Sequence, residues 1–219
     1  MQREETAEGA TIQEGRWLFS GQASFVAGVA TPGAQLPIER FPDVVFAGRS
    51  NCGKSSLINA LTFRKKLVRT SGTPGCTAQV NFFTLRDRAY LVDVPGYGYA
   101  KASKKEMIRW KNLIEFYFAS RTDAIAATCI LIDARRGVRE EDENLALWLA
   151  DKSVPLMFVV TKSDKATRAE TDAALASAEA VHGGVRVAAP LATSARTGEN
   201  AETLRALLAH AARSHKKLT

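Results

Sequence analysis

The chain has 219 residues, of which 46% are apolar and 24% are charged, an ordinary composition for a globular protein that buries a sizeable core. No apolar run approaches the ~20 residues of a membrane span, the acidic N-terminal segment indicates neither a secretory signal nor a basic transit peptide, and three scattered cysteines favour reduced thiols in the cytoplasm over a disulfide framework or a zinc site. The net charge of +7 favours an anionic partner, most simply nucleic acid or an anionic membrane, although a merely basic soluble protein also fits.

The N-terminal part of the chain shows no clear pattern. Residues 1–22 lack sustained periodicity, and we expect a flexible extension there. The segment 23–29 fits an edge strand or an ordered arm, and a turn-rich lead-in follows it. From there we expect one domain, residues 23–213, followed by a basic tail at 214–219. The first strong signal is the apolar run 43–47, which has the length of a buried strand.

A phosphate-binding motif follows this strand, because residues 48–55 have the pattern G-x-x-x-x-G-K-S. Its glycines let the backbone curl its amides around phosphate oxygens, Lys54 adds a charge that reaches the β- and γ-phosphates, and the Ser55 hydroxyl can ligate Mg²⁺. A Gly/Ser-rich surface turn is the alternative, but the preceding strand and the helical apolar spacing at 56–61 favour the phosphate loop. The predicted nucleotide-binding residues here are Gly48, Arg49, Ser50, Asn51, Cys52, Gly53, Lys54, Ser55 and Ser56.

The next stretch, residues 62–79, is basic and turn-rich and lacks the pattern of a regular element. Pro74 and Gly75 set up a turn that presents Thr77, whose oxygens can reach Mg²⁺ and the γ-phosphate when the segment closes. We therefore expect a segment that orders and disorders with the nucleotide. Its predicted binding residues are Gly75, Cys76, Thr77, Ala78 and Gln79.

Two apolar runs, 80–85 and 89–94, are separated by a short polar connection and should pair as a hairpin. The second run leads into a D-x-P-G motif. Asp93 fits the acidic residue that holds Mg²⁺, directly or through water, and Gly96 has no side chain to keep its amide away from a γ-phosphate. The predicted site residues here are Asp93, Val94, Pro95 and Gly96.

The rest of the chain alternates between helical and strand patterns. Ser103 and Glu106 predict a capped helix over 103–119. Its apolar stripe, expected to contact the core, consists of Met107, Trp110, Ile114 and Tyr117. Further strands are expected at 127–132, 155–160 and 185–189, and further helices at 140–150, 166–181 and 199–212. This order predicts an α/β fold in three layers, a mostly parallel sheet with one antiparallel edge strand and helices on both faces. Ligands bind such sheets at the carboxyl ends of the strands, here the loops after Ala47, Val92, Val160 and Ala189.

The segment Thr161-Lys162-Ser163-Asp164 indicates which base is bound. A carboxylate at Asp164 can accept hydrogen bonds from guanine N1–H and the 2-amino group, whereas adenine offers no such donor pair. The carbon stem of Lys162 can lie on the base plane, and Thr193-Ser194-Ala195 can present backbone amides to guanine O6. Taken singly, Asp164 also fits a helix N-cap, and residues 193–195 fit a plain turn. Together with the phosphate loop and Asp93, in this order, they favour a guanine site.

In this order and spacing, the phosphate loop, T-P-G-x-T, D-x-P-G, T-K-x-D and T-S-A resemble the translation-factor-related GTPases. Closer details at 48–51, 73–75, 81–83 and 95–100 resemble the EngB (YihA/YsxC) ribosome-biogenesis GTPases, over about residues 23–213. The resemblance implies a P-loop GTPase fold, binding of GTP or GDP with Mg²⁺, slow hydrolysis, a role in large ribosomal subunit assembly, and an association with cell division and septation. We further expect a cytoplasmic protein, a monomer, whose partner is the large ribosomal subunit or its RNA, not DNA.

The expected chemistry is slow. Many GTPases place a Gln just after D-x-x-G to orient the attacking water, and here that residue is Tyr97. We therefore expect hydrolysis to need a partner or a cation, with transition-state support from Lys54, Thr77 and Gly96 and no general base assigned. Related GTPases that carry an Asn like Asn51 in this loop use K⁺ near the phosphates, so the resemblance also predicts stimulation by K⁺.

Basic residues gather on the two segments expected to change with the nucleotide: Arg64, Lys65, Lys66 and Arg69, and Lys101, Lys104, Lys105, Arg109 and Lys111. If both segments touch ribosomal RNA, nucleotide state gates binding, and binding depends steeply on salt. Solvated surfaces are the alternative interpretation of these charges.

Two other functions compete with this one. A GTPase at the membrane or division site lacks support from a lipidation motif or a basic amphipathic helix. A metabolic P-loop kinase or ATPase fits poorly with Asp164 and Thr77.

Overall fold

The computed structural model describes residues 5–6, 10–68, 79–98, 103–181 and 183–215. The main strands are β3 (Ala23–Val29), β4 (Asp43–Gly48), β5 (Val80–Leu85), β6 (Ala89–Asp93), β7 (Ile125–Asp133), β8 (Leu156–Thr161) and β9 (Leu191–Ala192). They form one seven-stranded sheet in the order β3-β5-β6-β4-β7-β8-β9. A separate antiparallel pair, β1 (Glu5–Thr6) and β2 (Ala10–Thr11), precedes them.

Five neighbouring strands of the sheet, from β6 to β9, run parallel. Strand β5 is antiparallel to β6 on one side and to β3 on the other. The predicted hairpin and the mostly parallel sheet are therefore confirmed. The antiparallel strand does not lie at the edge, however, because β3 pairs along its outer side and becomes the edge strand itself.

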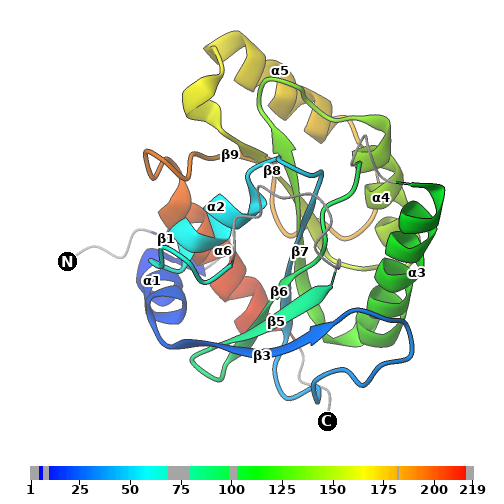
Figure 1. The fold of residues 1–219 in the computed structure, drawn as a ribbon. Coiled ribbons are helices and arrows are strands. Elements are labelled where there is room, and N and C mark those ends of the chain that lie inside the picture. Colours follow the sequence, from blue (N-terminus) through cyan, green and yellow to red (C-terminus); the bar gives the residue numbers. More distant parts are fainter. Residues whose placement is uncertain (1–4, 7–9, 69–78, 99–102, 182, 216–219) are drawn as a thin grey trace.

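Helices cover both faces of the sheet (Figure 1). They are α1 (Ile12–Ser20), α2 (Lys54–Leu61), α3 (Lys104–Arg121), α4 (Glu140–Asp151), α5 (Arg168–Glu179) and α6 (Ala201–Ser214), with short 3₁₀ turns η1 (Thr122–Ala124) and η2 (Ser163–Lys165). Side chains of β4 alternate between the two faces: Val45 and Ala47 pack in the cluster that holds α3, α4 and α5, whereas Val44 and Phe46 pack in the cluster that holds α1, α2 and α6. This double burial explains why the strand is apolar throughout.

Helix α3 begins with the predicted cap. The Ser103 hydroxyl accepts a hydrogen bond from the Glu106 amide, and the Glu106 carboxylate accepts one from the Ser103 amide at 2.7 Å. Of the predicted apolar stripe, Ile114 and Tyr117 are buried. Met107 is 52% exposed, so its assignment to the core is wrong: it lies in the first turn of the helix, where its neighbours Glu106 and Ile108 are exposed as well.

The other end of α3 is fixed to the start of β4 by a buried ion pair. Arg121 donates to both carboxylate oxygens of Asp43, at 3.0 and 2.6 Å, and the Tyr117 hydroxyl donates to the same carboxylate at 2.9 Å. Arg121 also donates to the Pro37 carbonyl at 2.9 Å. Because every oxygen of this buried carboxylate has a donor, the pair is satisfied without water.

The prediction of a flexible N-terminal extension is wrong for Ile12–Ser20, which forms α1. Thr11 caps its first turn, and Phe19 is fully buried in the core shared with α6. The two helices approach closely, because a Cβ on Gly15 would lie 2.5 Å from the Ala206 nitrogen. Tertiary packing against α6 stabilises a segment whose own sequence pattern is weak.

The expected strand at 185–189 is also wrong. Only Arg186 makes a strand-like bridge, to Leu156, and the chain then bends until the two-residue strand β9. Pro190 lies between them and has no amide hydrogen, so a ladder cannot run continuously through it.

Candidate functional site

The loop between β4 and α2 has the curled backbone that the sequence motif predicts. Gly53 has φ +105° and caps α2, and Asn51 has φ 65°. The Cys52 amide donates to the Arg49 carbonyl at 3.0 Å, which closes a turn inside the loop. A Cβ on Gly48 would lie 2.7 Å from Cys52 Sγ, so this position requires glycine. The loop meets the positive end of the α2 dipole, which suits an anion.

The D-x-P-G segment lies directly against this loop. The Ser50 amide donates to the Tyr97 carbonyl at 2.7 Å, and the Tyr97 amide donates to the Gly48 carbonyl at 3.3 Å. A Cβ on Gly96 would lie 3.1 Å from the Ser50 nitrogen. The segment that follows β6 is therefore pinned to the segment that follows β4.

Lys54 and Asp93 form an ion pair at the bottom of this site, and Asp93 is only 6% exposed. Asp93 is the last residue of β6, and Lys54 begins α2 after the loop that follows the neighbouring strand β4. Asp93 and the half-buried Ser55 supply a carboxylate and a hydroxyl, the hard oxygen donors that Mg²⁺ prefers. Within the described ranges no group of three or more His, Cys, Asp or Glu side chains gathers to hold a metal. That donor set fits an ion that keeps waters and shares phosphate oxygens rather than one held in an all-protein cage.

The loops after β8 and β9 meet at the same rim. The Ser194 hydroxyl donates to Asp164 Oδ1 at 2.6 Å, and Arg196 Nε donates to Asp164 Oδ2 at 2.7 Å. These two hydrogen bonds lower the pKa of Asp164, so the carboxylate stays ionised. The Ser163 amide donates to the Thr193 carbonyl at 3.2 Å and so joins the loop after β8 to the loop after β9.

Lys162 links the loop after β8 to the loop between β4 and α2. Its Nζ donates to the Asn51 carbonyl at 2.6 Å and to Asp133 Oδ2 at 3.0 Å. Burial would raise the pKa of Asp133, but hydrogen bonds from Arg135 and Lys162 outweigh it and hold the pKa well below its ordinary value. The buried Thr161 hydroxyl contacts the Cys52 carbonyl from the same side. All four predicted strand ends thus contribute to one connected rim, although the last contribution comes after Ala192 rather than Ala189.

Several predicted residues lie outside the described residues: Gly75, Cys76, Thr77 and Ala78. Gln79 is described, and its side-chain amide donates to Asn81 at 2.8 Å. The thiol of Cys52 is buried, and burial raises its pKa, which disfavours a reactive thiolate.

Sequence reasoning missed three residues of this rim. Arg196 follows T-S-A directly, and Asp133 ends a predicted strand, so position alone could have suggested both. Asp142 accepts a hydrogen bond from the Tyr97 hydroxyl at 2.6 Å, and no local pattern indicated that contact because 45 residues separate the pair.

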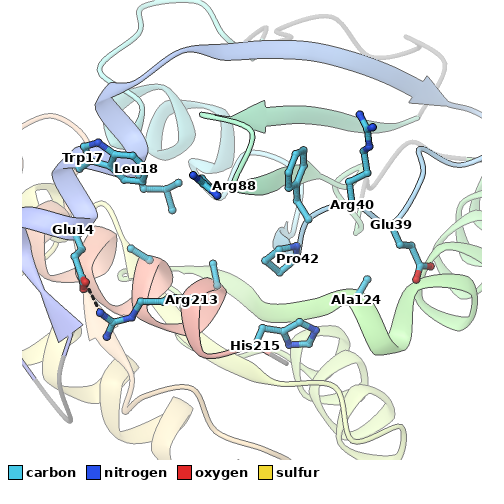
Figure 2. Close-up of a pocket in the computed structure, with 13 residues that line it drawn as sticks. Glu14, Trp17, Leu18, Glu39, Arg40, Pro42, Arg88, Ala124, Arg213 and His215 are labelled. Atoms are coloured by element: carbon cyan, nitrogen blue, oxygen red, sulfur yellow. Dashed lines mark hydrogen bonds and ion pairs between the residues drawn. The ribbon is translucent and has the colours of Figure 1, made fainter. Parts of the chain in front are cut away.

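A hollow of about 430 Å³ lies at the other end of the parallel strands, where they begin (Figure 2). It is lined by α1, by the end of α6 and by residues that precede strands, such as Pro42, Arg88 and Ala124. The strands begin there, so it is separate from the rim formed by the phosphate loop and Asp164. None of the helices within the described ranges is long and apolar enough to cross a membrane.

Comparison with known proteins agrees with the motifs. The profile of the family described as 50S ribosome-binding GTPase matches residues 43–162, more than half of the chain. A probable GTP-binding protein EngB from Cereibacter sphaeroides is 45% identical over 205 residues, covering 91% of this chain and 92% of the relative. The chain belongs to the EngB family of GTP-binding proteins. A second EngB relative, from Ruegeria pomeroyi, is 43% identical and covers 94% of this chain, more than residues 23–213 alone can supply.

Solved structures show the EngB fold. The crystal structure of a probable GTP-binding protein engB has a TM-score of 0.65 at 24% identity and covers 78% of this chain and 98% of its own. The bacterial selenocysteine-specific elongation factor EF-Sec has a TM-score of 0.58 at 19% identity, covering 82% of this chain and 30% of its own. Family membership makes this protein a GTP-hydrolysing enzyme.

Proposed function

We propose that the rim described above is the guanine-nucleotide site and that the protein acts as a GTP-dependent switch in large ribosomal subunit assembly. One observation carries the nucleotide assignment: the phosphate loop and an ionised Asp164, held by Ser194, lie at the same end of the parallel strands. Lys162 bonds to the phosphate-loop carbonyl of Asn51 and so fixes the distance between the two halves.

On the phosphate side, the loop amides and Lys54 hold the phosphates. Lys54 then leaves its ion pair with Asp93 and binds the phosphates instead. Ser55, Thr77 and, through water, Asp93 would hold Mg²⁺, which neutralises charge on the β- and γ-phosphates when bound. The remaining motif residues, Arg49, Ser56 and the segments around Thr77 and Gly96, complete the contacts predicted from the sequence.

On the base side, Asp164 accepts from guanine N1–H and the 2-amino group, and the Lys162 stem lies along the base. Arg196 already donates to Asp164 Oδ2, so guanine binds by sharing that oxygen or displacing the guanidinium. The Ala195 amide faces guanine O6, whereas the Ser194 amide already donates to the Glu199 carbonyl at 3.3 Å.

Hydrolysis is proposed to be slow without help, because Tyr97 stands where a water-orienting Gln would stand, and its hydroxyl is bound to Asp142. A cation near Asn51 would add positive charge beside the phosphates. Turnover in saturating KCl should exceed turnover in NaCl, and equal rates would remove the K⁺ role.

The ribosomal role rests on the family description and on charge. Lys65, Lys66, Lys104, Lys105 and Arg109 are all exposed, and within the described ranges none of them forms an ion pair. RNA phosphates are the anionic partner that such free cations suit best. We place the protein in the cytoplasm as a monomer and associate it with normal cell division and septation.

We also propose a longer folded domain than residues 23–213. Helix α1 buries Leu18 and Phe19 against α6, so the domain starts with α1 rather than after it.

Co-sedimentation with purified ribosomal subunits tests the ribosomal role. With a non-hydrolysable GTP analogue the protein should pellet with the large subunit, and binding should fall steeply between 50 and 200 mM salt, by roughly 10³-fold if about six phosphates are contacted. The variant Lys105→Glu should bind more weakly. Arg168→Glu is the matched control, since it reverses a charge in the first turn of α5. Binding in no nucleotide state would leave a GTPase without a ribosomal role.

A further inference from the structure

The peptide bond between Pro95 and Gly96 is held from the side of helix α3. Trp110 Nε1 donates to the Pro95 carbonyl at 2.8 Å. This peptide is trans and planar, so fixing the direction of the carbonyl also fixes the Gly96 N–H, which points the opposite way. Among the described residues, the Gly96 N–H donates to no acceptor. A partly exposed donor is therefore aimed away from α3 and left available.

The next residue is held from the side of helix α4. The Tyr97 hydroxyl donates to Asp142 Oδ1 at 2.6 Å, and the other oxygen, Asp142 Oδ2, accepts the Arg139 amide at 2.9 Å in the first turn of α4. Both Tyr97 and Asp142 are buried. Burial beside this carboxylate raises the pKa of Tyr97 well above its ordinary value, so the hydroxyl keeps its proton and remains the donor.

The two restraints also touch each other. The rings of Tyr97 and Trp110 meet edge to face, with centroids 5.7 Å apart. On its other side, the Tyr97 backbone bonds to Ser50 and Gly48 of the phosphate loop. Gly96 is thus held between two helices and the loop, and it cannot turn without breaking a hydrogen bond on one of these sides.

We propose that Trp110, Tyr97 and Asp142 form a clamp that orients the Gly96 N–H, and that this clamp sets the affinity of the site for GTP relative to GDP. The inference rests on the proposed placement of the γ-phosphate at Gly96. Because GDP has no γ-phosphate, an oriented Gly96 N–H strengthens GTP binding alone. The three clamp residues are positioning residues: they touch the Pro95–Gly96–Tyr97 backbone and not the nucleotide.

The clamp also indicates which helices a partner could act on to change the orientation of the Gly96 N–H. Helix α4 also contacts the phosphate loop itself, since Glu141 accepts from Arg49 Nη1 at 3.0 Å. A partner that shifts α3 or the first turn of α4 therefore changes the direction of the Gly96 N–H without entering the nucleotide site.

Two substitutions test the clamp, and the chain supplies a matched control for each. Trp110→Phe keeps an aromatic ring but removes the donor to Pro95. Its control is Trp148→Phe, which changes another half-buried tryptophan on the same face of the sheet. Tyr97→Phe removes one hydroxyl from a buried tyrosine–aspartate pair. Its control is Tyr117→Phe, which does the same at the opposite end of the sheet.

Affinities for GDP and for a non-hydrolysable GTP analogue are measured by titration calorimetry for each protein. Both clamp variants should weaken the analogue by about tenfold, the size expected for one lost hydrogen bond to a charged group, and change GDP affinity less than twofold. Both controls should leave the two affinities and their ratio unchanged. If Tyr97→Phe does not fold, Asp142→Ala removes the acceptor instead and should shift the ratio equally.

Equal weakening of GDP and the analogue, or no change in either, would overturn the clamp. Failure of the wild-type protein to bind either nucleotide would instead refute the proposed site itself, so the two failures are distinguishable.

Discussion

Replacing Asp164 by asparagine should change which base the protein prefers. Asp164 uses both oxygens as acceptors, from Ser194 at 2.6 Å and from Arg196 at 2.7 Å. In the proposed complex the same oxygens accept from guanine N1–H and the 2-amino group. Asparagine keeps one acceptor and turns the other position into a donor.

The size of the effect follows from this exchange. One hydrogen bond to a charged group is lost, and the new amide donor faces the 2-amino group of guanine, which is also a donor. GDP affinity should therefore fall by about 100-fold. Xanthosine diphosphate carries an oxygen in place of that amino group, so the new amide can donate to it, and its affinity should rise.

The assay is competition of unlabelled GDP, xanthosine diphosphate and ADP against a fluorescent GDP analogue. Asp123→Asn makes the same substitution in η1, which precedes β7 at the far edge of the sheet, and should change no affinity. If Asp164→Asn kept GDP affinity within threefold and gained none for xanthosine diphosphate, Asp164 would not contact the base, and the guanine site as proposed would be wrong.

Three further predictions concern charges that the fold holds in place. Lys54→Ala should weaken GDP binding by about 2–3 kcal/mol in calorimetry, and it should also lower the melting temperature of the nucleotide-free protein, because Asp93 loses its partner; unchanged binding would place the phosphates elsewhere. Arg121→Leu should cost about 3–5 kcal/mol in urea unfolding because it leaves the buried Asp43 charge without a cation, with only the Tyr117 hydroxyl as donor. Replacing both Arg121 and Asp43 by leucine should recover most of that loss, and a single-variant cost below about 1 kcal/mol would contradict this. Because the pKa of Asp133 is lowered in the folded protein, its charge stabilises the fold fully above the unfolded pKa of about 4, and this contribution is lost as pH falls through the folded value. The difference in unfolding free energy between wild type and Asp133→Asn should therefore shrink below about pH 4. A difference independent of pH would show that the Asp133 charge does not stabilise the fold.

Elements with local signals were predictable from the sequence. The apolar run of β4, the curled loop ending at Gly53, and the Ser103–Glu106 cap all depend on residues within a few positions of one another. Their physical causes are local, so the sequence pattern contains them. The order of motifs also predicts that the loops after these strands meet, and the loops after β4, β6, β8 and β9 do contact one another at one end of the sheet.

What could not be predicted depends on distant partners. Helix α1 forms because Phe19 packs against α6, nearly the whole chain away in sequence. The strand expected at 185–189 has suitable residues, but Pro190 limits its pairing, and the sheet accepts only β9 beyond it. The Tyr97–Asp142 contact at the rim could not be predicted for the same reason as α1. It joins two segments that only the fold brings together.

The most direct test of the central claim is nucleotide competition on the unmodified protein. A fluorescent GDP analogue bound to the protein in Mg²⁺ should be displaced by GDP and GTP, while ATP at about 1,000-fold higher concentration should leave it in place, since adenine offers Asp164 no pair of donors. Displacement by ATP at concentrations similar to GTP would contradict the assignment of Asp164 and its loop as the site that selects guanine.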